Sequence, residues 1–372
     1  MKKEVIIVGA GASGILSAIL IKREKPECNV TLIEKEKKIA KKLKASGNGK
    51  CNLSNSDLNI NYYNQKDFLK EKLKEFDYEK LKNLFLSLGL IIKTDKENRS
   101  YPYSENSKTV LDVLKSNLDN LGVRIILETE IIKIEKQNRF KLYSKKESYE
   151  ADYVIMAVGG CAAVNHFNGY DLLKELNHNL KEVSSSLVGL ITNEDLKELK
   201  GIRTKARVTV KGIKEDGEVQ FRENGISGIV VMNLSRLINN GDEIILDLMP
   251  EYSIKDLENL FNEKDLLKTL EGIFLNPLAF YIYNLGKSKS EVIKNIKNLK
   301  FTVKEKDSLI NAQVTKGGIL INEINDNFES RKVSGLYILG ETLDVDGICG
   351  GYNLHFAWLS SYFACKDLIK KL

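Results

Sequence analysis

The most constraining feature of the sequence lies within its first 34 residues, where an apolar run leads into a glycine-rich turn. Residues 5–8 are apolar and β-branched, which predicts a strand buried in a parallel sheet. A G-x-G-x-x-G turn follows at residues 9–14, and helical periodicity continues to about Arg23. A second apolar run at residues 30–33 ends on Glu34. This order of strand, turn, helix, strand and acid is the order that a dinucleotide-binding unit requires.

Each residue type in this unit has a physical reason. Gly9 permits a tight turn, Gly11 lets a pyrophosphate approach the backbone, and Gly14 lets the helix pack closely on the sheet. The first turn of the helix offers unpaired N–H groups and a partial positive charge to a diphosphate. Glu34 is placed to accept hydrogen bonds from ribose hydroxyls, and its charge disfavours a 2′-phosphate. The alternative is a tight connection between strand and helix that binds no ligand.

The length and charge of the chain limit its class. A chain of 372 residues has room for two or three domains. No apolar run reaches 18 residues, so we expect no transmembrane helix, and the first strand begins too early to leave room for a signal peptide. The expected location is therefore cytoplasmic. The net charge is +6, but the lysines are interspersed with acids, so a nucleic-acid partner is not expected.

The cysteines and histidines are few and dispersed. The five cysteines form no C-x-x-C pair, and His166, His178 and His355 lack the spacing of metal ligands. We therefore expect reduced thiols and no metal site.

The segment after the first unit alternates between helices and strands. Periodicity and caps predict helices over residues 67–76, 78–88 and 107–121, and strands over residues 123–127, 131–135 and 139–143. An irregular polar and aromatic loop is expected at residues 97–104. A buried strand from residue 153 ends in Gly159-Gly160, which suits a return to the sheet beside the first strand. Ala157 and Gly159 are therefore expected close to the cofactor.

Residues 187–310 change in character and are predicted to form an inserted domain. Two alternating runs, 207–213 and 219–222, flank Glu215-Asp216-Gly217, which is a hairpin signal. Residues 224–228 are expected to open a helix, and Ser253 to Asp256 resembles a capping box. The predicted limits are 1–186 for the first part of the dinucleotide-binding domain, 187–310 for a β-rich and then helical substrate domain, and 311–372 for the second part.

Further glycine-rich segments are expected near the cofactor. Residues 45–55 can expose backbone N–H groups and wrap around a ligand, and the alternative is a flexible surface loop. Residues 312–318 are expected to form a turn before the apolar residues 319–321. A strand ending at Gly340-Glu341, then Asp344 and Asp346, and then Gly350-Gly351 at a helix start, predicts a second cofactor contact. One of the two aspartates would bind hydroxyl groups. The alternative is a core strand followed by a packing helix.

These segments resemble those of a bacterial flavoprotein family. The family is labelled YhiN-like, BaiN-like or aminoacetone oxidase family FAD-binding enzyme. The matching stretches are residues 9–14, Ala45-Ser46-Gly47-Asn48-Gly49-Lys50-Cys51-Asn52, Val314-Thr315-Lys316-Gly317-Gly318 and residues 340–353. The resemblance covers essentially the whole chain. It implies an α/β fold with a glutathione-reductase-type Rossmann-like FAD domain and an inserted α+β domain.

The resemblance also implies which residues contact FAD. The adenosine diphosphate half would be held by Gly9, Gly11, Ala12, Ser13, Gly14, Glu34 and Lys35, with Ile131 as a backbone clamp for adenine. The middle of the cofactor and the flavin face would be lined by Lys42, Ser46, Gly47, Gly49, Lys50, Cys51 and Asn52, beside Ala157 and Gly159. The ribityl chain and ring would be held by Gly340, Glu341, Asp346, Gly347, Gly350, Gly351, Tyr352, Asn353 and Leu354. Amides at the last helix start would favour the reduced flavin.

The implied activity is that of an FAD-dependent oxidoreductase, a nucleotide-binding flavoprotein that exchanges hydride with a small organic substrate. A second G-x-G-x-x-G motif and a redox Cys pair are absent from the sequence, so an NAD(P)H donor would dock only transiently. The alternative hypotheses are a flavin-binding RNA-modification or partner-binding protein, and a structural protein that binds no flavin. Substrate, electron acceptor and oligomeric state are not indicated by the sequence.

The chain departs from the family in two stretches. Phe-Thr-His before Gly-x-Ser-Gly-Pro is replaced by Phe221-Arg222-Glu223-Asn224 before residues 225–229, so the His and the Pro are absent. The family's Gly-Ser-Thr-Gly-Asp-Gly stretch is also altered, at residues 163–170. These changes predict a different substrate or a lost activity.

No catalytic acid or base is assigned from the sequence. Cys51 could be a thiol activated by Lys50 or a small packed residue. Tyr352 could donate a proton or pack as a helix-capping aromatic, and His355 is expected to be structural.

Overall fold

The computed structural model describes residues 2–164, 166–261 and 265–372, and the chain divides into two compact units. Unit 1 contains Met1–Ser184 and Val314–Leu372, and unit 2 contains Ser185–Gln313. Each unit has its own hydrophobic core. Asn165, which belongs to the altered stretch at 163–170, lies outside the described residues.

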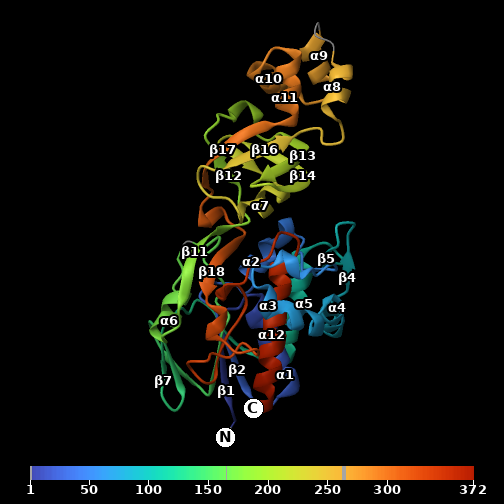
Figure 1. The fold of residues 1–372 in the computed structure, drawn as a ribbon. Coiled ribbons are helices and arrows are strands. Elements are labelled where there is room, and N and C mark those ends of the chain that lie inside the picture. The colour runs from blue at the N-terminus through green and yellow to red at the C-terminus, as the bar shows by residue number, and fades with distance from the viewer. Residues whose placement is uncertain (1, 165, 262–264) are drawn as a thin grey trace. The chain divides into compact units, whose positions relative to one another are not determined.

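A five-stranded parallel sheet forms the centre of unit 1 (Figure 1), with its strands in the order β19-β10-β1-β2-β6. The strands are β1 (Glu4–Val8), β2 (Asn29–Ile33), β6 (Arg124–Ile126), β10 (Tyr153–Met156) and β19 (Leu336–Ile338). The apolar residues of β1 are buried, as predicted for a strand with neighbours on both sides. Parallel pairing places the carboxyl ends of β1, β10 and β19 at one edge of the sheet.

Seven helices accompany this sheet in the described part of unit 1. They are α1 (Ala12–Glu24), α2 (Lys41–Ala45), α3 (Lys66–Glu75), α4 (Tyr78–Ser87), α5 (Ser107–Asn120), α6 (Gly169–Glu175) and α12 (Tyr352–Lys371). Local chemistry explains several of their starts. The Asp77 side chain accepts the N–H of Lys80 at the start of α4, and Asn106 accepts the N–H of Lys108 at the start of α5.

Three smaller sheets complete unit 1. They are β3 (Ser54–Asn55), β5 (Arg99–Pro102) and β4 (Ile92–Thr94); β7 (Ile131–Lys136), β8 (Phe140–Ser144) and β9 (Ser148–Ala151); and the pair β11 (Leu180–Ser186) and β18 (Val314–Ile319). Two expectations are corrected here. The predicted loop at 97–104 contains β5, which pairs with both of its neighbours, and the predicted turn at 312–318 is largely strand β18.

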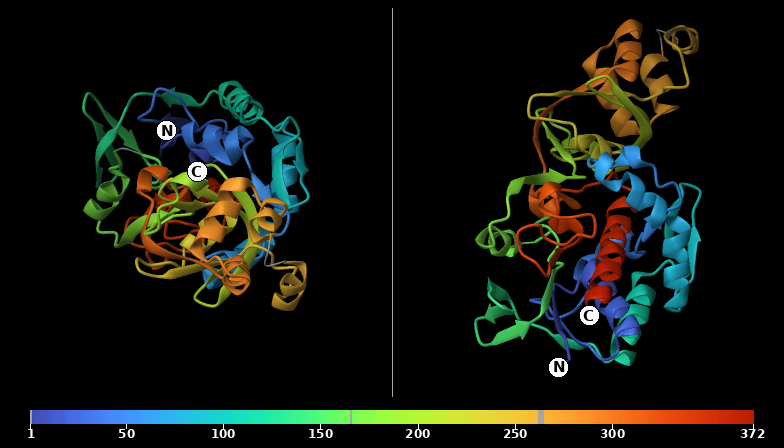
Figure 2. Two further views of the ribbon diagram at one scale, coloured as in Figure 1. Left: turned by 90° about the horizontal axis from the view of Figure 1, so that it is seen from above. Right: turned by 60° about the horizontal axis from the view of Figure 1, so that its bottom comes forward.

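Unit 2 is built around a closed barrel with the strand order β12-β15-β14-β13-β16-β17. The strands are β12 (Leu190–Thr192), β13 (Arg203–Val210), β14 (Ile213–Arg222), β15 (Gly225–Ser227), β16 (Glu243–Asp247) and β17 (Leu299–Lys306). The helices are α7 (Ile229–Ser235), α8 (Ile254–Leu260), α9 (Leu266–Glu271), α10 (Asn276–Leu285) and α11 (Lys289–Lys297). Helices α8 to α11 gather at one end of the barrel (Figures 1 and 2).

The hairpin of unit 2 turns at a different place from the predicted one. Glu215 to Gly217 lie inside β14 and pair with β13, whereas the turn is formed by Lys211 and Gly212. Both turn residues have positive φ angles, 50° and 80°, which match the twist of a two-residue hairpin. Residues 225–227 likewise form strand β15 instead of opening a helix, and α7 begins at Ile229. The predicted capping box at Ser253 and Asp256 is confirmed.

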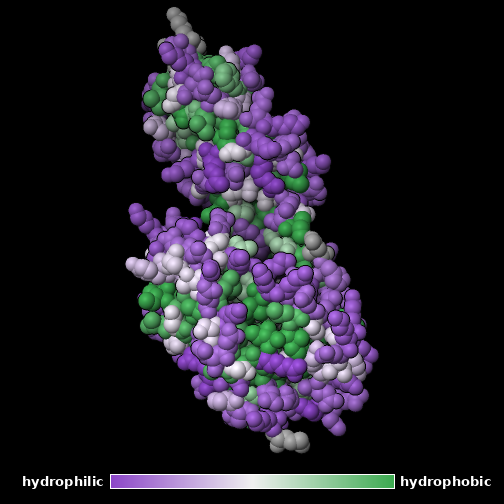
Figure 3. Space-filling model, turned by 180° about the vertical axis from the view of Figure 1, so that it is seen from behind, coloured by the Kyte–Doolittle hydropathy of each residue, from purple (hydrophilic) through white to green (hydrophobic). Residues whose placement is uncertain are grey.

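The face drawn in Figure 3 is mostly hydrophilic, with hydrophobic patches on both units. None of the helices in the described ranges combines the length and the apolar character needed to cross a bilayer.

Candidate cofactor site

The turn after β1 brings the first glycine motif to the carboxyl edge of the sheet. A Cβ on Gly14 would overlap the carbonyl oxygen of Gly9, so only glycine lets α1 pack this closely on β1. Glu34, which follows β2, accepts the N–H of Ala10 at 2.7 Å and the N–H of Glu36 at 2.9 Å. The two hydrogen bonds hold the carboxylate beside the glycine turn.

Three glycines of the predicted set face open space. A Cβ on Gly11 or Gly49 would meet no heavy atom within 4 Å, and one on Gly159 would meet only Nζ of Lys42, at 4.0 Å. Gly11 precedes α1, Gly49 belongs to the segment after α2, and Gly159 follows β10 close behind Ala157. The backbone at all three places is therefore accessible to a ligand.

Helices α1 and α12 run parallel and begin at different heights. Ser361 donates a hydrogen bond to the carbonyl of Ser13 at 2.9 Å, and Cys365 contacts the carbonyl of Ser17 at 3.6 Å. The Ser361 contact sets Ser13 level with Ser361. Helix α1 begins at Ala12, one residue before Ser13, and α12 begins at Tyr352, nine residues before Ser361, so α12 extends eight residues further at its N-terminal end. At 1.5 Å per residue this offset is about 12 Å.

Both helix starts leave backbone donors open. The first backbone hydrogen bond of α1 runs from the N–H of Ile15 to the carbonyl of Gly11, and that of α12 runs from His355 to Gly351. The N–H groups of the preceding three residues in each helix have no acceptor within the helix. These donors belong to Ala12, Ser13 and Gly14 in α1, and to Tyr352, Asn353 and Leu354 in α12. The site thus presents two positively polarised helix ends that are offset by about 12 Å along the helix axes.

The loop before α12 is held rigidly. Asn353 accepts the N–H of Gly347 at 2.8 Å and donates to the carbonyl of the same residue at 3.0 Å. Gly350 and Gly351 have φ angles of 122° and 104°, and a Cβ on Gly351 would overlap the carbonyl of Ser54. Tyr352 is the first residue of α12, and its hydroxyl donates to the carbonyl of Asp57 at 2.9 Å. This hydrogen bond links the helix start to the segment at Asp57.

The segment after α2 is a tight loop that includes the 3₁₀ turn Ser46–Gly49. Gly47, Asn48, Gly49 and Cys51 all have positive φ angles. Cys51 is fully buried, and burial raises the pKa of its thiol to about 12. Lys50 pairs with Glu105 at 2.7 Å instead of the thiol. The hypothesis that Lys50 activates Cys51 is therefore wrong, and Cys51 is a packed residue.

A polar cluster lies beside Gly159. Nζ of Lys42 donates to the carbonyl of Gly160 at 3.0 Å and lies 3.4 Å from Glu341, whose other oxygen accepts the N–H of Thr315 at 2.8 Å. A Cβ on Gly160 would lie 2.7 Å from Glu341, so the glycine makes room for the carboxylate. Lys42 and Glu341 were among the predicted cofactor contacts, whereas Gly160 and Thr315 were noted only as members of glycine-rich stretches. That position was their only signal.

The remaining predicted residues lie in several environments. Asp344 is buried and accepts hydrogen bonds from Gln65 and Lys181, both at 2.9 Å, so it is used inside the protein and does not face a ligand. Asp346 is also buried. Lys35 donates to the carbonyl of His166, at 2.6 Å. Ile131 lies in the separate β7-β8-β9 sheet, and its carbonyl accepts a hydrogen bond from Asn168.

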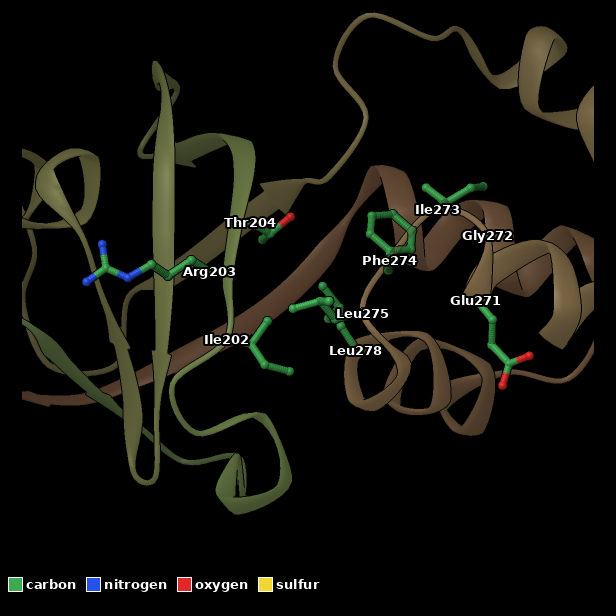
Figure 4. A pocket seen from close by; sticks show the side chains of 9 residues that line it. All are labelled: Ile202, Arg203, Thr204, Glu271, Gly272, Ile273, Phe274, Leu275 and Leu278. Atoms are coloured by element: carbon green, nitrogen blue, oxygen red, sulfur yellow. The ribbon is translucent and has the colours of Figure 1, made fainter.

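Unit 2 has a hollow of its own, of about 320 Å³, between the start of β13 and the connection from α9 to α10. Figure 4 shows Ile202, Leu275 and Leu278 pointing toward one another, whereas the charged ends of Arg203 and Glu271 point away. Apolar side chains meet at its centre, and its lining also includes Arg203, Thr204 and Glu271. In the described ranges, no cluster of three or more His, Cys, Asp and Glu side chains is arranged to hold a metal ion.

Comparison with known proteins identifies relatives across the chain. Residues 3–367 match the family described as HI0933-like protein Rossmann domain. The chain is 33% identical over 398 residues to a 3-dehydro-bile acid delta(4,6)-reductase of Clostridium scindens, covering 96% of the chain and 97% of that relative. It is 30% identical over 400 residues to a ribosomal RNA dihydrouridine synthase of Haemophilus influenzae, covering 99% and 98%.

The fold also has counterparts among solved structures. The quinol fumarate reductase subunit FrdA of E. coli shares 16% identity with a TM-score of 0.52, over 100% of this chain and 70% of that chain. A flavocytochrome c3 fumarate reductase shares 13% identity with a TM-score of 0.51, over 99% and 78%. These structures support the mixed α/β fold with its parallel sheet. On the match over residues 3–367 and the 33% identity to a reductase, the chain belongs to the HI0933-like Rossmann family, a family of flavoprotein oxidoreductases.

Proposed function

We propose that the site binds FAD and reduces a carbon–carbon double bond conjugated to a carbonyl group. The observation that carries the proposal is the pair of parallel helix starts, offset by about 12 Å along the helix axes. A diphosphate suits the start of α1, and an extended ribityl chain can place the isoalloxazine ring at the start of α12. FMN also carries a phosphate and the ring, so the adenosine ribose proposed at Glu34 is what distinguishes FAD from the mononucleotide.

In this proposal each part of the site has one task. Glu34 holds the adenosine ribose, and the open backbone at Gly11 receives the diphosphate. Gly49 and Gly159 leave space along the ribityl chain, and the open N–H groups of α12 face the pyrimidine edge of the ring. When bound, the flavin supplies hydride transfer, and the positive end of α12 stabilises the negative charge of its reduced form. The other predicted contacts stay proposals of the same kind.

The substrate class follows from the names of two relatives. A delta(4,6)-reductase that acts on a 3-dehydro-bile acid removes unsaturation near a ketone, and a dihydrouridine synthase saturates the ring double bond of uracil beside a carbonyl. Both reactions add a hydride and a proton to an electron-poor double bond. We infer that this chain performs the same reaction class, with a small organic enone as the first candidate substrate.

The test separates the two half-reactions. The FAD-loaded protein is mixed anaerobically with NADH or NADPH, and the oxidised flavin absorbance is followed. The protein is then reduced with dithionite and mixed with 2-cyclohexen-1-one as a probe. We expect the enone to reoxidise the flavin and to yield cyclohexanone. A reduced flavin that oxygen reoxidises but that no enone or nitroalkene reoxidises would refute the proposed reaction class.

A base in RNA is the second candidate substrate, and a lysine patch favours it. Lys37, Lys38 and Lys44 are exposed and, among the described residues, have no acidic partner, and Lys41 is exposed beside them. These lysines lie between Glu34 and the loop at Gly47, next to the proposed cofactor site. Clustered cations attract phosphate backbones.

The RNA candidate has its own test. The dithionite-reduced protein is mixed with a uridine-rich RNA oligonucleotide, with free uridine as the control. RNA as substrate predicts flavin reoxidation by the oligonucleotide alone, with a rate that falls steeply as salt rises. If neither the oligonucleotide nor free uridine reoxidised the flavin while the enone did, RNA would be excluded as the substrate.

A further inference from the structure

The loop at Gly47 packs against a tyrosine, Tyr101, whose hydroxyl forms no hydrogen bond with the described residues. Tyr101 lies in β5, the central strand of the β3-β5-β4 sheet, and is half-buried. A Cβ on Gly47 would lie 3.5 Å from Cε1 of its ring, so the ring lies against the loop. Within the part of the chain that the structure describes, no group forms a hydrogen bond with the Tyr101 hydroxyl.

The strand that carries Tyr101 is tied to the start of α12. The side-chain oxygen of Asn52 accepts the N–H of Ser100 at 3.1 Å and lies 2.9 Å from the position of a Cβ on Gly351. Ser54 pairs with Ser100 in the sheet, and its carbonyl would also contact that Cβ. Tyr101 directly follows Ser100, and both partners of Ser100 lie against Gly351. The proposed function places the flavin ring at this helix start.

The charges of Arg99 and Lys50 favour the phenolate of Tyr101, whereas those of Asp95 and Glu97 oppose it. Nζ of Lys50 lies 6.0 Å from the ring centroid. Glu105 pairs with both Lys50, at 2.7 Å, and Lys93, at 2.6 Å, so two ammonium groups share one carboxylate. Nearby positive charge stabilises a phenolate, which is the form that a tyrosine takes after it gives up a proton.

The hydroxyls of Tyr352 and Tyr63, at the helix start, already form hydrogen bonds. The hydroxyl of Tyr352 donates to the carbonyl of Asp57 at 2.9 Å, and that of the buried Tyr63 donates to the carbonyl of Tyr352 at 2.8 Å. Burial raises the pKa of Tyr101 as well, which keeps its hydroxyl protonated at neutral pH. Tyr101 thus combines a protonated hydroxyl, an unused hydrogen bond and partial exposure.

We propose that Tyr101 is the catalytic acid that protonates the α-carbon of the substrate. The inference rests on the proposed function, which requires an acid because one hydride and one proton are added to the double bond. The hydride reaches the β-carbon as the reduced flavin becomes oxidised. The electron pair of the double bond then takes the proton of Tyr101, which forms the α C–H bond and breaks the O–H bond. The phenolate regains a proton from water.

The first experiment tests the placement of Tyr101 without using activity. The FAD-free and FAD-loaded proteins are treated with tetranitromethane, and nitration of each tyrosine is measured by peptide mass spectrometry. We expect FAD to slow nitration of Tyr101 at least fivefold. Tyr103, which is 70% exposed, is the internal control and keeps its rate. An unchanged rate at Tyr101 in protein that binds FAD would overturn the inference.

The second experiment tests the chemistry with Y101F and with Y103F as the matched surface control. Each FAD-loaded variant is reduced and mixed with 2-cyclohexen-1-one or with 1-nitrocyclohexene. We expect Y101F to slow reoxidation by the enone by 10²-fold or more, the usual contribution of a general acid. The nitroalkene should still reoxidise the flavin of Y101F, because a nitronate is a stable product without enzymatic protonation, and the nitronate should accumulate.

The outcomes separate the inference from the proposed function. Wild-type rates of protonated product from Y101F would overturn the role of Tyr101 and leave the reaction class standing. Equal slowing of both probes by Y101F would also overturn it, because loss of structure impairs hydride transfer and protonation alike. Failure of the wild-type protein to reduce either probe would instead refute the proposed function.

Discussion

Replacing Gly14 by alanine tests the close packing of α1 on β1, which aims the helix start at the proposed diphosphate. The added Cβ would overlap the carbonyl oxygen of Gly9 and lie 3.1 Å from its carbon and 3.3 Å from the Cβ of Ala157. None of these atoms belongs to a flexible side chain, so the helix must move away by on the order of 1 Å. Overpacking of this kind costs about 1–3 kcal/mol, and we expect G14A to lose about 2 kcal/mol of unfolding free energy.

The assay is urea unfolding of the FAD-free protein, with FAD affinity measured by flavin fluorescence. G11A is the matched control, because its Cβ would meet no heavy atom within 4 Å but would enter the open space proposed for the diphosphate. Gly11 caps α1, where an alanine costs up to about 1 kcal/mol. We expect G11A to keep most of its stability and to lose FAD affinity tenfold or more.

A G14A protein that unfolds at the wild-type urea concentration would refute the packing argument. A G11A protein that binds FAD as tightly as the wild type would refute the position of the diphosphate.

Three further predictions concern buried groups. Burial lowers the pKa of His355 to about 4, so between pH 6.5 and 4 only the unfolded chain takes up this proton. The free energy of unfolding should therefore fall by about 3 kcal/mol over this range. The urea midpoint of H355Q should lack this dependence on pH. Cys51 should resist iodoacetamide at pH 8 in the folded protein, and its modification, read by mass spectrometry, would contradict the packed loop. The free energy of unfolding of D344A, measured in urea, should be about 2 kcal/mol lower, because Gln65 loses its buried acceptor. That of K181M should fall by less than about 1 kcal/mol, because Lys181 is half exposed.

The parallel core was predictable because its signals are local. The β-branched run of β1, the glycine turn and Glu34 occupy consecutive stretches, and each residue type has one dominant structural use. The fold class and the family were predicted correctly for this reason. The capping box at Ser253 is another local signal, and it is confirmed.

The errors arose where distant segments decide the structure. Glu215 to Gly217 were predicted to form a turn, but they pair with β13 and lie in a strand. The hairpin turns instead at Lys211 and Gly212. Gly225 belongs to a strand because closing the barrel brings it against β12. The closed barrel itself leaves no signature in any one stretch of sequence.

At the candidate site, residue type was predictable but direction was not. Asp344 and Asp346 read alike in sequence, yet Asp344 is tied to Lys181 from a strand far along the chain. Tyr101 lay in a stretch predicted to be an irregular loop, and only its pairing in β5 brings it to Gly47. The assignment of the cofactor contacts stays a prediction until a ligand is measured at them.

The most direct test of the central claim is a titration of the FAD-free protein with FAD and, in parallel, with FMN and ADP, each followed by calorimetry. We expect one FAD per chain, bound at least tenfold more tightly than either fragment, because only FAD combines an adenosine at Glu34 with a flavin ring at the start of α12. Equal affinity for ADP and FAD would show that the start of α12 contributes nothing. Absence of FAD binding would contradict the account as a whole.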